Sequence, residues 1–203
     1  VVDDTGGAFG PFAGQLFVGD QTRSNVFRVV LDEVQGRYQG CAINFIDHLQ
    51  SGIIRSRFAP DGSLWVGQTG RGWGSRGRAK FGVERIVYDG ETVPFSIHSV
   101  KLSHDGFIVK FTRPANPKQA STPSAYVVDR WSYKHHPNYG SPKFDQATLK
   151  VEDVQLSPDH MTARLKVPLR AGTMYQLKLD IAGADDAKLA SRVAWYTLNR
   201  LRK

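Results

Sequence analysis

The stretch GSLWVGQTGRGWGSRGR, residues 62–78, contains a short strand followed by an unusual loop. Leu64 and Val66 fall on one face of the expected strand and Trp65 on the other. Beyond residue 66, five glycines alternate with arginine and tryptophan. No regular strand or helix suits this composition, because each glycine costs backbone entropy without packing a side chain. We expect either a mobile basic loop or a site where an acidic or planar ligand meets guanidinium and indole groups.

The same strand occurs earlier in the chain. Residues 14–19 (GQLFVG) match residues 62–67 (GSLWVG), and the two copies start 48 positions apart. A polar, arginine-containing loop and a second apolar strand follow each copy. Repeats of this length built from short strands are typical of β-propeller blades, which bury both faces only by stacking on neighbours. The repeat also predicts that Phe17 and Trp65 occupy equivalent positions and pack between sheets.

The segment between the two copies contains a turn, a strand and one histidine. Residues 38–42 (YQGCA) predict a compact turn. Further along, alternation predicts an amphipathic strand with Ile54 and Phe58 on one face and Arg55 on the other. His48 is a candidate base or ligand, and a structural or solvent-facing histidine is the alternative.

The pattern changes near residues 94–98. From there, short apolar segments alternate with turn residues to the end of the chain. One of them follows an Asp-Gly turn and places Phe107, Val109 and Phe111 on one face. Seven or so such strands over about a hundred residues predict an immunoglobulin-like β-sandwich. The expected fold is therefore all-β: about two blades of a partial β-propeller over residues 1–97, and a sandwich over residues 98–203.

Composition excludes several function classes. The formal charge of +8 invites a nucleic-acid partner, but the cations are spread over both halves without a helix-turn-helix, zinc-finger or RNP motif. No run of about 18 apolar residues predicts a membrane span. Cys41 is the single cysteine, so an internal disulfide and a cysteine-based zinc site are excluded.

A second aromatic and basic loop lies in the expected sandwich. It contains Trp131, Tyr133, His135, His136 and Tyr139. Sugar binding by stacked aromatic rings, a histidine metal site and simple packing of the loop all fit this composition. The acidic pairs at 3–4 and 185–186 match no calcium loop, so we expect solvated turns there and no metal site.

Three stretches carry a family resemblance: PFAGQLFVGDQTRSNVFRV (11–29), SGIIRSRFAPDGSLWVGQTGRGWGSRG (51–77) and SVKLSHDGFIVKFTRPANP (99–117). The first two resemble the last blades of secreted bacterial β-propeller proteins. Those proteins are similar to soluble quinoprotein glucose and sorbosone dehydrogenases and are often of a large haem-binding or cytochrome-linked type. The third stretch resembles the immunoglobulin-like module appended to such propellers.

The resemblance implies a ligand pocket at the propeller axis. Carried over by position, the residues expected to line it are Asp20, Gln21, Gln68, Arg71, Trp73 and Arg76. The catalytic histidine of the dehydrogenases lies in earlier blades and has no counterpart that can be placed here, so the catalytic residues are unknown. The resemblance allows pyrroloquinoline quinone or haem as a cofactor carried by the rest of the protein.

The same resemblance implies a C-terminal piece of a longer protein, since a closed propeller needs about four to eight blades. Upstream blades of the same protein, or another chain, would complete the ring, and carbohydrate is an expected ligand. The expected location is periplasmic or extracellular. The expected function is part of a secreted sugar or alcohol oxidoreductase. The alternative is a non-catalytic scaffold that binds carbohydrate or protein.

Overall fold

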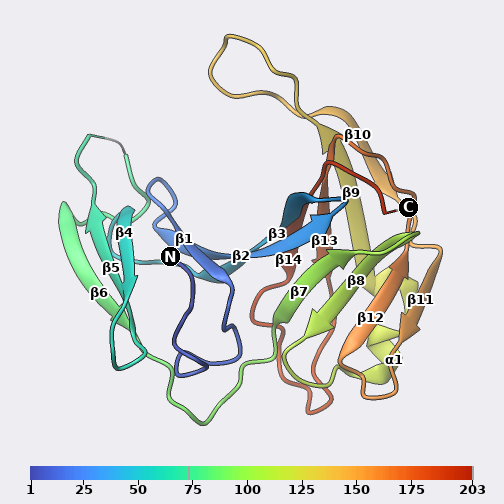
Figure 1. The fold of residues 1–203 in the computed structure, drawn as a ribbon, viewed down its shortest axis with the longest axis horizontal. Coiled ribbons are helices and arrows are strands. Elements are labelled where there is room, and N and C mark those ends of the chain that lie inside the picture. The colour runs from blue at the N-terminus through green and yellow to red at the C-terminus, as the bar shows by residue number, and fades with distance from the viewer. Residues whose placement is uncertain (73, 203) are drawn as a thin grey trace. The chain divides into compact units, whose positions relative to one another are not determined.

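The computed structural model describes residues 1–72 and 74–202, and this part of the chain is 47% strand and 3% helical. Its strands form three antiparallel sheets, none of them closed (Figure 1). The all-β prediction is confirmed. Contacts divide the chain into one unit of Val1–Val30 with Ala42–Val93 and another of Leu31–Cys41 with Pro94–Lys203.

The first unit is built from two runs of three strands. The strands are β1 (Leu16–Asp20), β2 (Asn25–Val34), β3 (Arg37–Ile46), β4 (Ile53–Phe58), β5 (Leu64–Thr69) and β6 (Phe81–Ile86). β1 pairs antiparallel with β2, and β5 pairs antiparallel with both β4 and β6. The two copies of the sequence repeat therefore form strands β1 and β5, each followed by a loop and an antiparallel partner.

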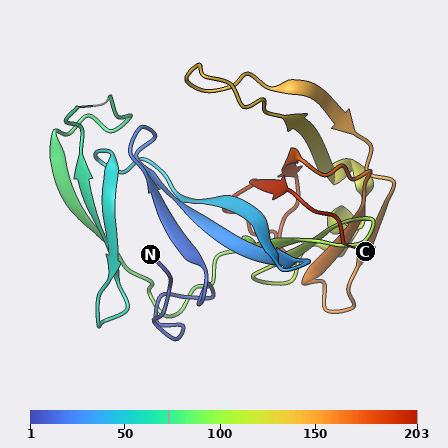
Figure 2. The same ribbon diagram turned by 45° about the horizontal axis from the view of Figure 1, so that its top comes forward.

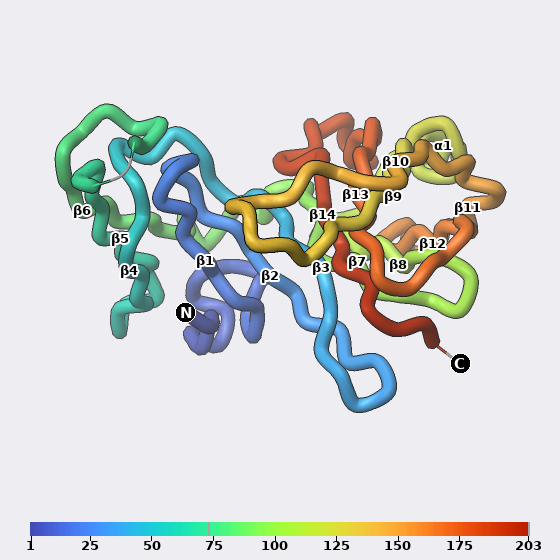
Figure 3. The backbone as a smooth tube through the Cα atoms, turned by 90° about the horizontal axis from the view of Figure 1, so that it is seen from above, coloured from blue at the N-terminus to red at the C-terminus, as the bar shows by residue number. Residues whose placement is uncertain are grey.

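The hairpin of β2 and β3 turns at Gln35 and Gly36, whose φ angles are 52° and 68° (Figure 3). Positive φ at both central residues defines a type I′ turn, which matches the twist of paired strands. The turn predicted at residues 38–42 is therefore wrong, because those residues lie inside β3. The sequence assigned all of residues 1–97 to the blades, whereas the distal half of this hairpin, Leu31–Cys41, groups with the second unit.

The core of the first unit is a cluster of phenylalanine rings. Phe17 is 1% exposed, and its ring meets those of Phe9 and Phe58 edge-on, with centroids 5.4 and 5.5 Å away. Trp65, its partner in the repeat, is 42% exposed. Within the described residues Trp65 therefore does not pack between sheets as predicted. In β5 the buried residues are the flanking Leu64 and Val66. The central aromatic residue of the repeat is therefore buried in β1 and exposed in β5.

The strand β4 departs from simple alternation. Its register against β5 shifts between Ile53 and Arg55. A bulge of this kind moves the residues on one side of it to the other face. Ile53 and Phe58 are consequently both buried, while Ile54 is exposed. The predicted face holds for Phe58 and is wrong for Ile54.

The second unit has eight strands and two short helices among the described residues. They are β7 (Ile97–Leu102), β8 (Gly106–Phe111), α1 (Pro117–Ala120), η1 (Pro123–Ala125), β9 (Tyr126–Ser132), β10 (Phe144–Leu149), β11 (Asp153–Leu156), β12 (Thr162–Lys166), β13 (Thr173–Leu179) and β14 (Val193–Leu198). One sheet has the order β11-β12-β8-β7, and in the other β3 is followed by β14, β13, β9 and β10. The predicted hairpin after residue 95 is present, and Phe107, Val109 and Phe111 are all buried.

Hydrogen bonds to a buried carboxylate, that of Asp32, attach the distal half of β2 to the second unit. Asp32 is 2% exposed. It accepts hydrogen bonds from the Tyr196 hydroxyl (2.8 Å), the Leu102 amide (2.7 Å) and the Arg202 guanidinium (2.8 Å). Burial, together with the hydrogen bond to Asp32, raises the pKa of Tyr196 above its ordinary value. Tyr196 therefore stays neutral, and able to donate to Asp32, at pH values where an ordinary tyrosine ionises.

Candidate functional site

The loop that joins β5 to β6, residues 70–80, is fastened at both ends. The Gly70 amide donates to the Lys80 carbonyl (3.0 Å), which closes the loop on itself. The Ala79 amide donates to the Gln50 carbonyl (3.0 Å), and the Ser51 hydroxyl donates to the Ala79 carbonyl (2.7 Å). These bonds tie the returning arm of the loop to the segment between β3 and β4.

The middle of the 70–80 loop is fastened to the turn between β1 and β2. The Arg76 amide donates to the Thr22 carbonyl at 2.8 Å. The Gly77 amide donates to the Ser24 hydroxyl at 2.9 Å. Because the amides of residues 70, 76, 77 and 79 all have partners, these contacts favour an ordered backbone at those positions over the mobile alternative.

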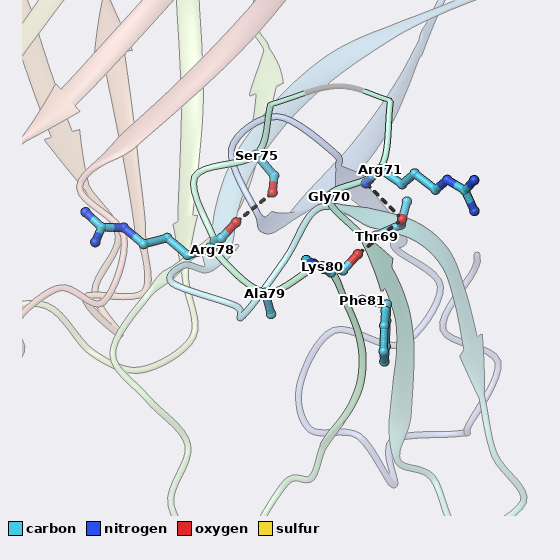
Figure 4. Close-up of a pocket in the computed structure, with 9 residues that line it drawn as sticks. Thr69, Gly70, Arg71, Ser75, Arg78, Ala79, Lys80 and Phe81 are labelled. Carbon is cyan, nitrogen blue, oxygen red and sulfur yellow. Dashed lines mark hydrogen bonds between the residues drawn. The ribbon is translucent and has the colours of Figure 1, made fainter.

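The 70–80 loop and the strand ends beside it enclose an open pocket of about 790 Å³ (Figure 4). This volume is in the range of small-molecule sites, about 300–1,000 Å³. The lining consists of Thr69, Gly70, Arg71, Ser75, Gly77, Arg78, Ala79, Lys80 and Phe81. The described lining thus combines cations and hydroxyls with one aromatic ring, and no carboxylate is among its residues.

Among the described residues, the cations of the pocket have no acidic partners. Within the described chain, no carboxylate lies within 4.0 Å of the charged groups of Arg71, Arg78 or Lys80, although Arg85 of the same sheet holds Asp61 at 2.7 Å. Arg71 and Arg78 extend to opposite sides of the loop (Figure 4). The two guanidinium groups therefore place positive charge at separate points around the pocket. That arrangement suits a ligand with more than one anionic group.

Phe81 supplies the apolar side of the pocket. It is the first residue of β6, and the residue is 78% exposed. A large apolar side chain left in water beside unpaired cations offers a plane for a flat ligand. The geometry therefore fits a planar molecule that carries carboxylates.

The structure brings several of the predicted site residues near one another without placing all of them in the pocket. Arg71 lines it. The Gln21 side chain reaches the same strand end, where its amide donates to the Thr69 carbonyl at 3.4 Å. The Asp20 carboxylate accepts from the Arg23 amide at 2.8 Å and so serves its own turn. Arg76 is exposed on the loop and is not part of the lining.

Two further predicted residues have different outcomes. Gln68 is only 4% exposed, and its amide donates to the Glu84 carboxylate inside the sheet, so its contacts are structural. Trp73 lies outside the described residues. The prediction missed Arg78, Lys80 and Phe81 as lining residues, and the signal for the first two was the continued alternation of cations up to residue 80.

Other candidate sites gain no support from the geometry. His48 is exposed, and the described residues contain no group of three or more histidine, cysteine, aspartate or glutamate side chains able to hold a metal ion. Among the helices that the structure describes, none is long and apolar enough to cross a membrane. Comparison of the chain with protein-family models, curated proteins and solved structures gave no match.

The close packing of Gly77 allows a test of the loop. A Cβ at this position would collide with the backbone of Gln50, so Gly77→Ala must displace the loop from its anchor. We expect a loss of about 1–3 kcal/mol in the free energy of unfolding, the usual cost of overpacking. Tryptic cleavage within residues 71–78 should also become faster in the native protein.

The matched control is Gly74→Ala in the same loop, where an added Cβ meets nothing within 4 Å. Urea unfolding and limited proteolysis of both variants provide the comparison. Equal behaviour of the two variants would show that the 70–80 loop is not held at Gly77.

Proposed function

We propose that this chain is part of a secreted β-propeller oxidoreductase related to the quinoprotein sugar dehydrogenases, and that its 70–80 loop binds a carboxylated ligand. The observation that carries the proposal is the group of unpaired cations, Arg71, Arg78 and Lys80, around a pocket of about 790 Å³. Guanidinium groups bind carboxylates through paired hydrogen bonds. A guanidinium without an acidic partner in the protein is free to form both of these bonds with a ligand.

Pyrroloquinoline quinone has the chemistry that this lining accepts, since it is planar and carries several carboxylates. Arg71 and Arg78 would hold carboxylates at separate points, and Phe81 would face the ring system. When bound, a quinone supplies two-electron redox chemistry. The described lining offers no histidine, cysteine or methionine, so the ligands of a haem iron would belong to another part of the protein.

A partner surface is part of the proposal. On one face of β4-β5-β6, Trp65 and Val83 are 42% and 65% exposed. Exposed apolar sheet faces of this kind mark interaction surfaces or aggregation hazards. A neighbouring blade, from the same protein or from another chain, is the partner that would cover it. A periplasmic or extracellular location accompanies this assignment.

The alternative is a non-catalytic scaffold that binds carbohydrate or protein. It is favoured by the same described lining, which holds cations and hydroxyls but no histidine or carboxylate able to take a proton from a substrate. Reduction of an artificial electron acceptor by the complete protein, supplied with a sugar after reconstitution with the quinone, separates the two functions. Turnover supports the oxidoreductase, and binding without turnover supports the scaffold.

The binding site itself is tested by the double variant Arg71→Gln, Arg78→Gln. We expect affinity for pyrroloquinoline quinone, measured by titration calorimetry, to fall by about 10- to 100-fold. That range corresponds to about 1.5–3 kcal/mol for hydrogen bonds to charged groups. The melting temperature should stay unchanged, because neither side chain has an ionic partner in the described protein.

The control variant is Arg55→Gln on β4, an exposed arginine that donates a hydrogen bond to the adjacent Ile54 carbonyl. It should bind the quinone normally. If the double variant binds normally but melts early, the two arginines are structural and the pocket is not the ligand site.

A further inference from the structure

A second basic and aromatic surface lies in the other unit, on the loop that joins β9 to β10. The 133–143 loop, Tyr133–Lys143, extends well beyond the two strands that carry it (Figures 1 and 2). β10 is the last strand of its sheet, so this hairpin stands at a sheet edge. Its position leaves the loop open to a large ligand.

The 133–143 loop is positively charged and has no acidic residue of its own. It contains two lysines, two histidines and two tyrosines. The nearest carboxylate in the sequence, Asp145, is held by Arg170 and lies 3.7 Å from Arg130. Asp129, which also attracts Lys143, is bound by Lys178 at 2.8 Å. Both nearby acids therefore already have a cationic partner, which leaves the lysines of the loop available to a ligand.

The two lysines are held in place by aromatic rings. The Lys143 ammonium lies 3.7 Å from the ring centroid of Trp131, and the Lys134 ammonium lies 4.4 Å from that of Phe144. Both lysine side chains remain exposed. A cation over a ring keeps its charge and loses rotational freedom, so less ordering entropy is lost when it binds an anion.

The tyrosines provide exposed rings in the same loop. Tyr139 is fully exposed, and Tyr133 is 51% exposed. Tyrosine offers a large amphipathic contact surface with few rotatable bonds, which is why binding loops use it. The surface thus combines flat apolar faces, hydroxyls and fixed ammonium groups within one loop.

We propose that the 133–143 loop binds an acidic polysaccharide, a polymer of uronic acids. The faces of Tyr133 and Tyr139 would cover the apolar faces of sugar rings, while Lys134 and Lys143 would bind the carboxylates. A nucleic acid fits less well, because the loop contains no arginine that could bind phosphates or base edges through paired hydrogen bonds. This inference is independent of the 70–80 loop and of the proposed oxidoreductase.

The test uses the full chain and polygalacturonate as the probe, with affinity measured by titration calorimetry. Tyr139→Ala is the main variant, since a fully exposed ring can be removed without disturbing the fold. Lys143→Gln is the second variant. We expect each to weaken binding about tenfold, with an unchanged melting temperature for Tyr139→Ala.

Two controls locate the effect. Lys150→Gln removes an exposed lysine just beyond β10 and should bind normally. The Arg71→Gln, Arg78→Gln variant should also bind polygalacturonate normally, which separates this surface from the pocket of the other unit.

Several results would overturn the inference. They are absence of binding, equal binding of fully methyl-esterified polygalacturonate, and loss of binding only in the arginine double variant. Tighter binding of oligo(dT) would identify the surface as a nucleic-acid site instead. Tighter binding of polyglutamate would identify it as a site for acidic protein segments.

Discussion

Phe17→Ala is expected to lower the free energy of unfolding by about 3–5 kcal/mol, the usual cost of truncating a buried phenylalanine. The side chain is 1% exposed, and its ring meets three others edge-on, with Phe45 closest at 5.0 Å. Their rings cannot all move into the space that the truncation leaves, so a cavity adds to the lost burial. Urea unfolding of this chain measures the change.

The matched variant is Trp65→Ala, at the equivalent position of the sequence repeat. We expect a cost below about 1 kcal/mol, because Trp65 is 42% exposed and its indole donates a local hydrogen bond, to the Ser63 hydroxyl (3.0 Å). A larger loss at Trp65 than at Phe17 would show that Trp65 is buried in β5 as Phe17 is in β1.

The contrast between these two residues shows why the repeat could be found in the sequence while the buried face of each copy could not. Both copies contain three consecutive apolar residues, LFV and LWV. Alternation cannot decide which face turns inward when both faces are apolar. The packing around each strand decides it, with phenylalanines around β1 and with Leu64 and Val66 inside β5.

Local irregularities limited the prediction in the same way. The turn of β2 and β3 uses Gln35-Gly36, and glutamine is not among the residues that commonly adopt positive φ, so the glycine at residue 40 was the stronger turn signal. β10 was not predicted, because its sequence FDQATL has few apolar residues and lies at a sheet edge. The bulge in β4 likewise leaves no mark in the residue pattern.

The candidate site was predictable in composition and not in geometry. The alternation of glycine and arginine marked the loop, and Arg71 does line the pocket. The closure of that loop depends on contacts such as Gly77 with Ser24, which are 53 positions apart. Sequence spacing carries no information about such a contact. Gln68 has the residue type expected of a ligand-binding group, yet its position in β5 places its side chain on the buried face of the sheet, with Leu64 and Val66.

Asp32→Ala is expected to destabilise the second unit by about 3–5 kcal/mol, the range for breaking a buried charge network. The carboxylate is 2% exposed, and its loss leaves three donors, at Tyr196, Leu102 and Arg202, without their acceptor. Two of these donors are themselves buried, so water cannot replace the carboxylate at low cost. Thermal unfolding followed by near-ultraviolet circular dichroism, which reports on the buried tyrosines, measures the loss.

Double-mutant cycles divide this effect between the partners. Tyr196→Phe removes one hydroxyl and keeps the ring, so its coupling to Asp32→Ala isolates a buried hydrogen bond to a charged group, worth about 1.5–3 kcal/mol. Arg202→Ala should couple more weakly, because the guanidinium side chain is 41% exposed and water screens part of its attraction. A near-neutral Asp32→Ala, or stronger coupling to Arg202 than to Tyr196, would mean that the carboxylate is solvated in solution. The distal half of the β2–β3 hairpin would then owe its place in the second unit to its strand pairing beside β14.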